Sequence, residues 1–133
     1  MGRILILEEA PGPMQALRKS LQGAHELQFA ADPLSAIAVL EHEKIDLIIA
    51  RVHLEQSNIF EFIRAVKEDN RYKEIPLLCF CGKRSKIARI MDENLAHATE
   101  LFGADKYISL DHFCMGDSCD FDSLRREIEV VLV

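Results

Sequence analysis

Charged and sulfur-bearing side chains stand at the ends of three apolar runs in the sequence. Glu8 and Glu9 follow the first run, Arg51 follows the second, and Cys81 ends the third. An arginine beside two carboxylates can form charge-assisted hydrogen bonds and supply the positive charge that a metal ion would otherwise supply. We therefore expect Arg51 to pair with Glu8 or Glu9 and to keep the site free of metal. The alternative is that Arg51 extends into solvent, since an exposed ion pair adds only about 0–1 kcal/mol.

A second group of reactive side chains lies between residues 111 and 120. His112, Cys114 and Cys119 could form a metal site or a redox pair with nearby aspartates. Structural zinc normally takes two close ligand pairs such as C-x2-C, and C-x4-C with a single histidine fits that pattern poorly. Four cysteines in a chain whose N-terminus does not resemble a secretion signal favour reduced thiols. No metal or cofactor is expected, while metal binding and reversible oxidation of Cys114 with Cys119 stay open as alternatives.

Apolar runs alternate with helical-period segments along the chain. Runs at 4–7, 45–50, 76–81 and 107–110 are nearly continuous, which favours parallel strands covered on both faces. Residues 25–29 alternate in polarity, as in an edge strand with one wet face. Between the strands, apolar residues recur every three or four positions and make one stripe on each of five helices. These stripes are Met14/Leu17/Leu21, Leu34/Ile37/Leu40, Ile59/Phe62/Ile63/Val66, Ile87/Ile90/Met91/Leu95 and Leu124/Ile128/Val131.

Five strands that alternate with five helices predict an α/β domain of the doubly wound class, with helices on both faces of a parallel sheet. Asp32 followed by Pro33 is a typical N-cap and first turn for the second helix. The whole chain, residues 1–133, is expected to form one domain. Sites in such sheets lie beyond the carboxyl ends of the strands, so residues just after each run are the functional candidates.

The charge balance argues against several classes of function. The chain has 16 basic and 22 acidic residues and a net charge of −6, whereas nucleic acid and anionic membranes attract a basic face. No apolar run approaches the roughly 20 residues that a bilayer span needs. No nucleophile–base pair is visible, and the acidic loop after the first strand would repel the phosphate of a flavin. We expect a cytoplasmic protein that is not an enzyme and binds neither nucleic acid nor membranes.

Over nearly its whole length the sequence resembles the receiver domains of two-component response regulators, the CheY-like superfamily. The matching stretches are RILILEEAP, IDLIIARVHL, NIFEFIRAVKEDNRYKEIPLLCF and GADKYISL. The resemblance implies a flavodoxin-like sheet of strand order 2-1-3-4-5 and a role in bacterial signal transduction. In that family an Asp at the end of the third strand accepts a phosphoryl group beside a divalent metal held by an acidic pair. A Ser or Thr after the fourth strand and a Lys after the fifth sense the new group.

Other residue types occupy these positions here. Arg51 stands at the phosphoacceptor position and cannot form an acyl phosphate. Glu8 and Glu9 stand for the acidic pair, Cys81 for the hydroxyl and Leu110 for the lysine. The resemblance therefore implies an atypical pseudo-receiver that is not phosphorylated in the usual way and acts by binding proteins. The alternative on the same fold is a sensor of thiol or metal events at Cys114, Cys119 and His112.

The resemblance also implies where partners bind. Tyr107 stands where the family carries an aromatic residue whose rotamer reports activation, although an ordinary strand tyrosine is an equally good interpretation. The long helix before Gly103 and the expanded connection 111–120 flank the face of helix four, strand five and helix five, which the family uses for partners and dimers. Neutral surface insertions are the other interpretation. We expect Lys83, Arg84 and Phe113 to contribute to that face, and a homodimer through it is an option.

Overall fold

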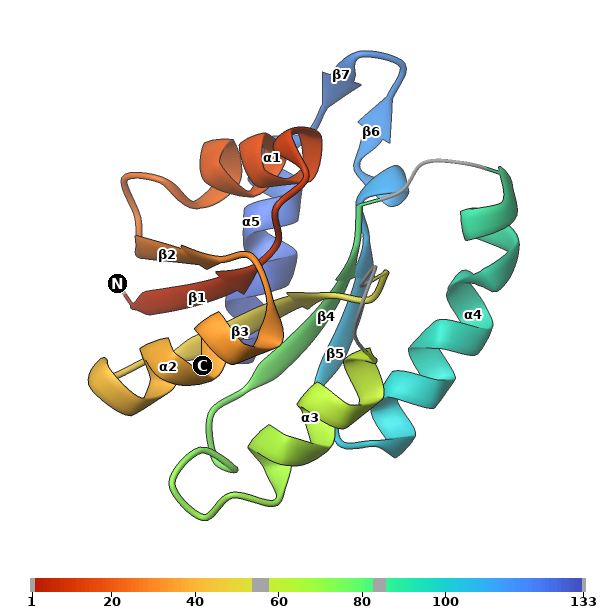
Figure 1. The fold of residues 1–133 in the computed structure, drawn as a ribbon. Coiled ribbons are helices and arrows are strands. Elements are labelled where there is room, and N and C mark those ends of the chain that lie inside the picture. The colour runs from red at the N-terminus through yellow and green to blue at the C-terminus, as the bar shows by residue number, and fades with distance from the viewer. Residues whose placement is uncertain (1, 54–57, 83–85, 133) are drawn as a thin grey trace.

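The computed structural model describes residues 2–53, 58–82 and 86–132, apart from the side chain of Ala88. These residues form a parallel five-stranded sheet in the order β2-β1-β3-β4-β5 (Figure 1). The order confirms the doubly wound, flavodoxin-like class predicted from the sequence, with the strand of alternating polarity at one edge. The strands are β1 (Arg3–Leu7), β2 (Glu26–Ala30), β3 (Leu47–Arg51), β4 (Leu77–Cys81) and β5 (Lys106–Ser109). The helices are α1 (Pro11–Leu21), α2 (Pro33–His42), α3 (Ile59–Lys67), α4 (Lys86–Leu101) and α5 (Phe121–Glu129), with 3-10 turns η1 (Leu110–His112) and η2 (Val130–Leu132).

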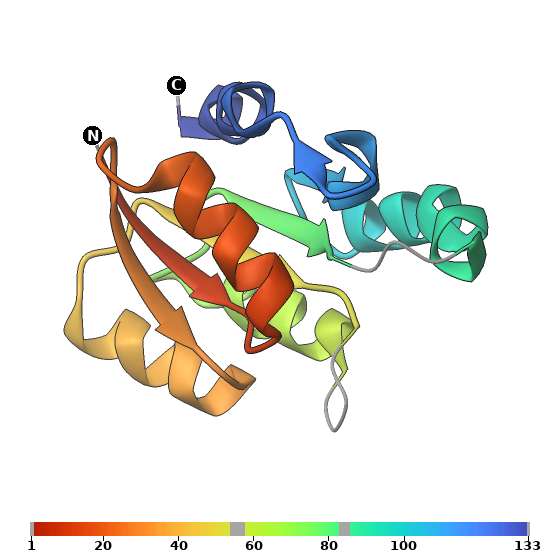
Figure 2. The same cartoon turned by 90° about the horizontal axis from the view of Figure 1, so that it is seen from above.

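The helices cover both faces of the sheet (Figure 2). α1 and α5 pack on one face, where Leu17 and Leu124 meet Ile4 and Ile6 of β1. The opposite face carries α2, α3 and α4 on the alternate strand residues. Strands buried on both faces need apolar side chains at every position, which is why the sequence shows continuous runs. Among the described helices, none is long and apolar enough to cross a bilayer.

Short polar side chains begin three of the helices. Asp32 accepts a hydrogen bond from the Ser35 backbone N–H at 2.8 Å, which confirms the predicted N-cap of α2. Asn58 caps α3 and Asp120 caps α5 in the same way. Each cap satisfies a backbone donor that would otherwise lack a partner in the first turn.

The predicted stripe of α2 is only partly buried. Leu34 is 84% exposed, while Leu40 and Ala36 reach the core. Spacing identifies the residues that share one side of a helix, but it does not fix which of them the sheet covers. Leu34 lies in the first turn of α2, where its side chain is exposed.

The stripe of α4 departs further from the expectation. Leu95 packs against the core and Thr99 is fully buried, but Ile87 and Ile90 face solvent. A hydrogen bond between Asp92 and β5, together with the buried Thr99, turns the helix so that a different side meets the sheet. The prediction that Ile87 and Ile90 belong to the same buried stripe as Leu95 is therefore wrong.

The expanded connection between β5 and α5 contains a small hairpin. β6 (Cys114–Met115) and β7 (Ser118–Cys119) are antiparallel, and Gly116 turns between them with a φ of 59°. Cys114 and Cys119 lie opposite each other with their Cα atoms 4.0 Å apart and form a disulfide. The expectation of four reduced thiols is wrong for this pair, because the sequence was interpreted there as an irregular loop rather than a paired hairpin. Cys79 and Cys81 are buried and are not part of a disulfide.

Candidate functional site

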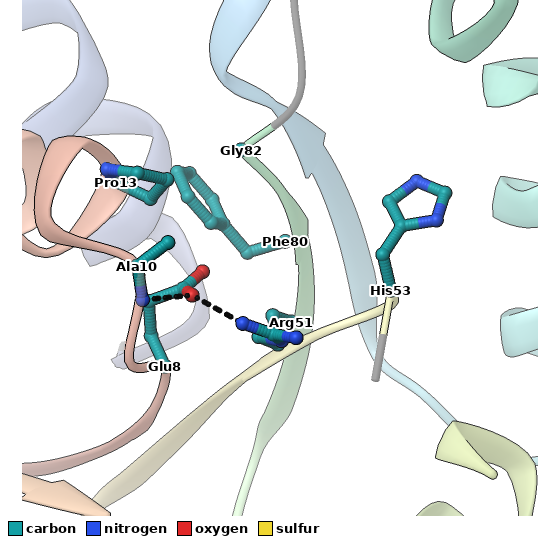
Figure 3. A pocket seen from close by; sticks show the side chains of 7 residues that line it. All are labelled: Glu8, Ala10, Pro13, Arg51, His53, Phe80 and Gly82. Carbon is teal, nitrogen blue, oxygen red and sulfur yellow. Dashed lines mark hydrogen bonds and ion pairs between the residues drawn. The ribbon is translucent and has the colours of Figure 1, made fainter. Parts of the chain in front are cut away.

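A cavity of about 260 Å³ opens at the carboxyl ends of β1, β3 and β4 (Figure 3). It lies where the sequence predicted a site, because parallel strands all end at the same edge of a sheet. Its walls come from the β1–α1 loop, the end of β3 and the end of β4. The lining residues are Glu8, Ala10, Pro13, Arg51, His53, Phe80 and Gly82.

Glu8 is the buried acid of this cavity, with only 3% of its side chain exposed. Its Oε1 accepts hydrogen bonds from the backbone N–H groups of Glu9 and Ala10, both at 3.0 Å. The loop after β1 therefore folds around the carboxylate and fixes its position. Glu9 itself is exposed.

Arg51 ends β3 and points back across the cavity toward Glu8 (Figure 3). Its Nη1 donates to the Glu8 Oε1 at 3.1 Å, and 12% of its side chain is exposed. The predicted pairing with Glu8 is confirmed, and the alternative of an arginine extended into solvent is wrong. Its Nε is buried without a hydrogen-bond partner among the described residues, so the guanidinium is only partly satisfied.

Gly82 and Pro13 close one side of the cavity. A Cβ atom at Gly82 would overlap the ring of Pro13, so only glycine allows the end of β4 to lie this close to the start of α1. Gly82 was a candidate by its position after the third run. Pro13 was not, because nothing in the spacing of α1 indicates that its ring faces another strand.

Cys81 and Leu110 do not reach the cavity. Cys81 is buried in the core beneath α2, α3 and α4, and Leu110 is buried in the core on the other face. β5 ends one residue before Leu110, at Ser109, which pairs in register with Cys81. The Ser109 hydroxyl is buried and has no hydrogen-bond partner in the described part of the chain. Sequence reasoning missed Ser109, since one serine inside an apolar run gives no functional signal.

Known proteins are similar to this chain in structure, although not in sequence. No family model and no curated protein matches the sequence, but solved structures match over nearly the full length. The chemotaxis response regulator CheY4 of Vibrio cholerae is 23% identical, with 98% of each chain covered and a TM-score of 0.72. The N-terminal receiver domain of a Bacteroides fragilis response regulator is 16% identical over 100% of this chain and 98% of that one, with a TM-score of 0.77. This chain has the receiver-domain fold.

A third receiver domain of this fold was solved with a metal. It belongs to a sensor histidine kinase of Pseudomonas aeruginosa PAO1, in which a magnesium ion is coordinated in the active site cleft. That domain is 14% identical, covers 98% of this chain and 97% of its own, and has a TM-score of 0.72. In this chain Glu8 already accepts three hydrogen bonds at one oxygen, and the Arg51 cation stands beside it. A divalent cation prefers several open oxygen ligands, so the residues here do not fit it.

Tyr107 connects the last strand of this receiver fold to α4. The half-buried side chain donates a hydrogen bond from its hydroxyl to Asp92 Oδ1 at 2.7 Å. Burial, reinforced by this bond to a carboxylate, raises the pKa of Tyr107 well above its usual value. Asp92 was missed in the sequence, because a contact between a helix and the following strand leaves no periodic signal.

The residues predicted to contact a partner differ in where the structure places them. Phe113 is partly buried and packs against the core beneath α1 and α5, and its contribution to a partner face stays a prediction. Lys83 and Arg84 lie outside the described residues. Arg89, three residues into α4, forms an ion pair with Asp111 at the start of the expanded connection.

All four cysteines lie outside the lining of the cavity. The disulfide occupies Cys114 and Cys119, and the described residues include no group of three or more His, Cys, Asp or Glu side chains that could hold a metal. Neither this geometry nor the comparisons support the sensor alternative with His112. Burial raises the pKa of the Cys79 thiol to about 12, against a smaller opposing effect of a hydrogen bond with Thr99. Cys79 therefore packs as a neutral thiol in the core.

Proposed function

We propose that this chain is a signalling module of the receiver fold that is not phosphorylated at the end of the third strand and acts by binding proteins. The observation that carries the proposal is the ion pair between Arg51 and Glu8. We place it in a bacterial two-component or related pathway in the cytoplasm, and we do not expect it to be an enzyme.

The first support for the proposal is that the side chain of Arg51 cannot accept a phosphoryl group. An acyl phosphate forms on a carboxylate, and a guanidinium has no oxygen to accept the phosphoryl group. The Arg51 cation lies 3.1 Å from Glu8, so it neutralises the acid that would otherwise attract a divalent metal. Both requirements of phosphotransfer, the acceptor and the metal ligand, are altered by one residue.

The second support for the proposal comes from the two positions that would sense a phosphoryl group. Cys81 and Leu110 are buried in two separate cores on opposite faces of the sheet. Neither could contact a group bound at Arg51 without leaving its core. Signalling by this chain would therefore depend on which surfaces it presents to partners, with no phosphoryl group as its trigger.

The test is intact mass spectrometry of the 133-residue chain before and after incubation with Mg²⁺ and acetyl phosphate. We expect the mass to stay unchanged. A covalent adduct of one phosphoryl group would overturn the proposal, and peptide mapping would then identify the acceptor, with His53 as the first residue to inspect.

A substitution at the same position sharpens the test. Arg51→Asp restores a carboxylate at the end of β3 and should raise the affinity for Mg²⁺, measured by calorimetry. Arg64→Asp makes the same charge change on an exposed position of α3 and serves as the matched control. Equal Mg²⁺ binding by the two variants would contradict the idea that Arg51 excludes the metal.

A further inference from the structure

A second cavity, of about 440 Å³, opens at the amino ends of the strands, on the edge of the sheet opposite the cavity of Glu8 and Arg51. The start of β1 and the end of α5 lie close together there in both views (Figures 1 and 2). Among the described residues, its lining contains two carboxylates and no lysine or arginine. The lining residues are Gly2, His25, Asp46, Pro76, Glu129, Val131 and Leu132.

His25 is the buried polar side chain of this second cavity, with only 5% of it exposed. Its Nδ1 accepts a hydrogen bond from the backbone N–H of Gly2 at 3.0 Å, so the proton of the neutral ring lies on Nε2. Nε2 donates to Oε2 of Glu129 at 2.7 Å. The imidazole therefore fixes the Glu129 carboxylate through one oxygen and leaves the other, Oε1, outside this bond.

Asp46 is held in a similar way on the other side of Gly2. Its Oδ2 accepts a hydrogen bond from the backbone N–H of Arg3 at 2.8 Å, and its own N–H donates to the Arg3 carbonyl at 2.8 Å. In the described part of the chain its carboxylate has no further hydrogen bond or ion pair. Both acids are thus preorganised, each with one oxygen bound by the protein and one oxygen left for a ligand.

The cations of the chain neutralise these two acids only in part. Nε of Arg125 lies 3.8 Å from Oε1 of Glu129, beyond hydrogen-bond distance, and Nη2 of Arg125 is shared with Asp122 at 3.5 Å. Arg126 in the last turn of α5 bonds Ser123. The other cations at this edge are paired elsewhere or exposed: Arg3 with Glu26 and Glu43, Lys67 with Asp105, Lys106 with Glu127, and Lys44 and Lys73 in solvent.

The end of α5 favours a cation in the same place. The last carbonyl groups of a helix lack partners within it and carry the negative end of its dipole. α5 runs directly into η2, whose Val131 and Leu132 line the cavity. Together with Pro76 they provide apolar lining beside the two acids, and we call these three residues the apolar wall.

We infer that this second cavity binds a primary ammonium group carried on a short aliphatic chain. The ammonium has three donors, and it bonds Oδ1 of Asp46 and Oε1 of Glu129 while its methylene groups lie against the apolar wall. A metal ion fits less well, because the described residues include no group of three or more His, Cys, Asp or Glu side chains that could hold one. A free alkylamine and the lysine side chain of a partner protein both carry this chemistry.

The binding of n-butylammonium to the full chain tests the inference. Backbone amide chemical shifts of the ¹⁵N-labelled protein are followed at constant ionic strength, and the amides of Gly2, Asp46 and Glu129 should shift with a dissociation constant of about 1–10 mM. 1-Butanol has the same chain without the charge, and tetramethylammonium has the charge without N–H donors. Each should bind at least about tenfold more weakly.

Substitution of the two acids locates the site. Asp46→Asn and Glu129→Gln each keep an oxygen for their protein partner but lose the charge, and each should weaken the binding of n-butylammonium by about tenfold. Glu93→Gln makes the same charge change at an exposed position of α4, outside the lining, and should leave the binding unchanged. Circular dichroism of each variant establishes that it is folded.

Nα-acetyllysine N-methylamide carries the same ammonium on a peptide backbone and distinguishes the two sources. Binding as tight as that of n-butylammonium, or tighter, assigns the cavity to a lysine of a partner protein. Weaker binding assigns it to a free alkylamine, because the backbone is then excluded from the opening.

Three results would overturn the inference: no shift at about 50 mM n-butylammonium, equally tight binding of 1-butanol, or an equal effect of Glu93→Gln and the two acid variants. This cavity shares no lining residue with that of Arg51 and Glu8. The outcome is therefore independent of the mass measurement with acetyl phosphate, and each proposal can fail without the other.

Discussion

Arg51 donates to the same oxygen of Glu8 that already accepts two backbone N–H groups. The three donors converge on Oε1 from the end of β3 and from the loop after β1. The carboxylate therefore holds together two segments that are 43 residues apart in the chain. In this cavity Glu8 and Arg51 form a structural connection between the end of β3 and the loop after β1.

The three converging bonds predict an asymmetry between the two residues of the pair. Glu8→Ala should lower the free energy of unfolding by about 3–5 kcal/mol, because it leaves a buried cation and two backbone donors without their acceptor. Arg51→Ala should cost less, about 1–3 kcal/mol, because Glu8 keeps its two backbone partners. Urea unfolding of both variants measures the difference. A larger loss for Arg51→Ala would contradict the role given to Glu8.

The bond between Tyr107 and Asp92 should stabilise the packing of α4 on β5. Tyr107→Phe removes the donor and should cost about 1–2 kcal/mol in the free energy of unfolding, the usual range for a hydrogen bond to a charged group. Asp92→Asn keeps an acceptor at the same place and should cost less than Asp92→Ala. Chemical denaturation compares the three variants, and equal losses for Asp92→Asn and Asp92→Ala would show that the bond contributes nothing.

The helix caps predict how stability depends on pH. Hydrogen bonds from Ser35 and Ser123 lower the pKa values of Asp32 and Asp120 below the ordinary value of 3.8. A carboxyl group whose pKa is lower in the folded protein than in the unfolded chain stabilises the fold fully at a pH above the unfolded pKa. This contribution is lost as the pH falls through the folded pKa. The free energy of unfolding should therefore decrease below about pH 4.

Substitution of a cap isolates this effect. Asp32→Asn keeps a side-chain oxygen for the Ser35 N–H but does not titrate, so the decline in stability below pH 4 should be shallower than in the natural chain. Unfolding curves at pH 7 and at pH 3 provide the comparison. An unchanged slope for Asp32→Asn would mean that this cap does not contribute to acid sensitivity.

The disulfide in the hairpin should add a modest amount of stability. Cys114 and Cys119 are five residues apart, and closing so short a loop contributes about 2 kcal/mol in the chain-entropy description. A strong reductant should lower the melting temperature of the natural chain but not that of a variant with both cysteines changed to serine. An unchanged melting temperature of the natural chain in reductant would contradict a stabilising role of the disulfide.

The sequence predicted a doubly wound parallel sheet and the location of the cavity, while the order of the strands followed from the resemblance to receiver domains. Continuous apolar runs identify strands buried on both faces, and the alternation of strands with helices restricts the sheet to few topologies. Because such strands end together at one edge, Glu8 and Arg51 could be paired from their positions after two runs. The Asp32 cap could also be predicted, since it depends only on residues that are adjacent in the chain.

Three features were decided by the tertiary structure alone. The rotation of α4 leaves Ile87 and Ile90 exposed, although their spacing matches that of core residues. The hydroxyl of Tyr107 bonds Asp92, and Cys114 faces Cys119 across a turn that the sequence had presented as a loop. Periodicity reports which side chains share a face, because it depends on the local geometry of one element. Which face is covered depends on how whole elements pack against one another, and that is set by contacts between residues that no local pattern connects.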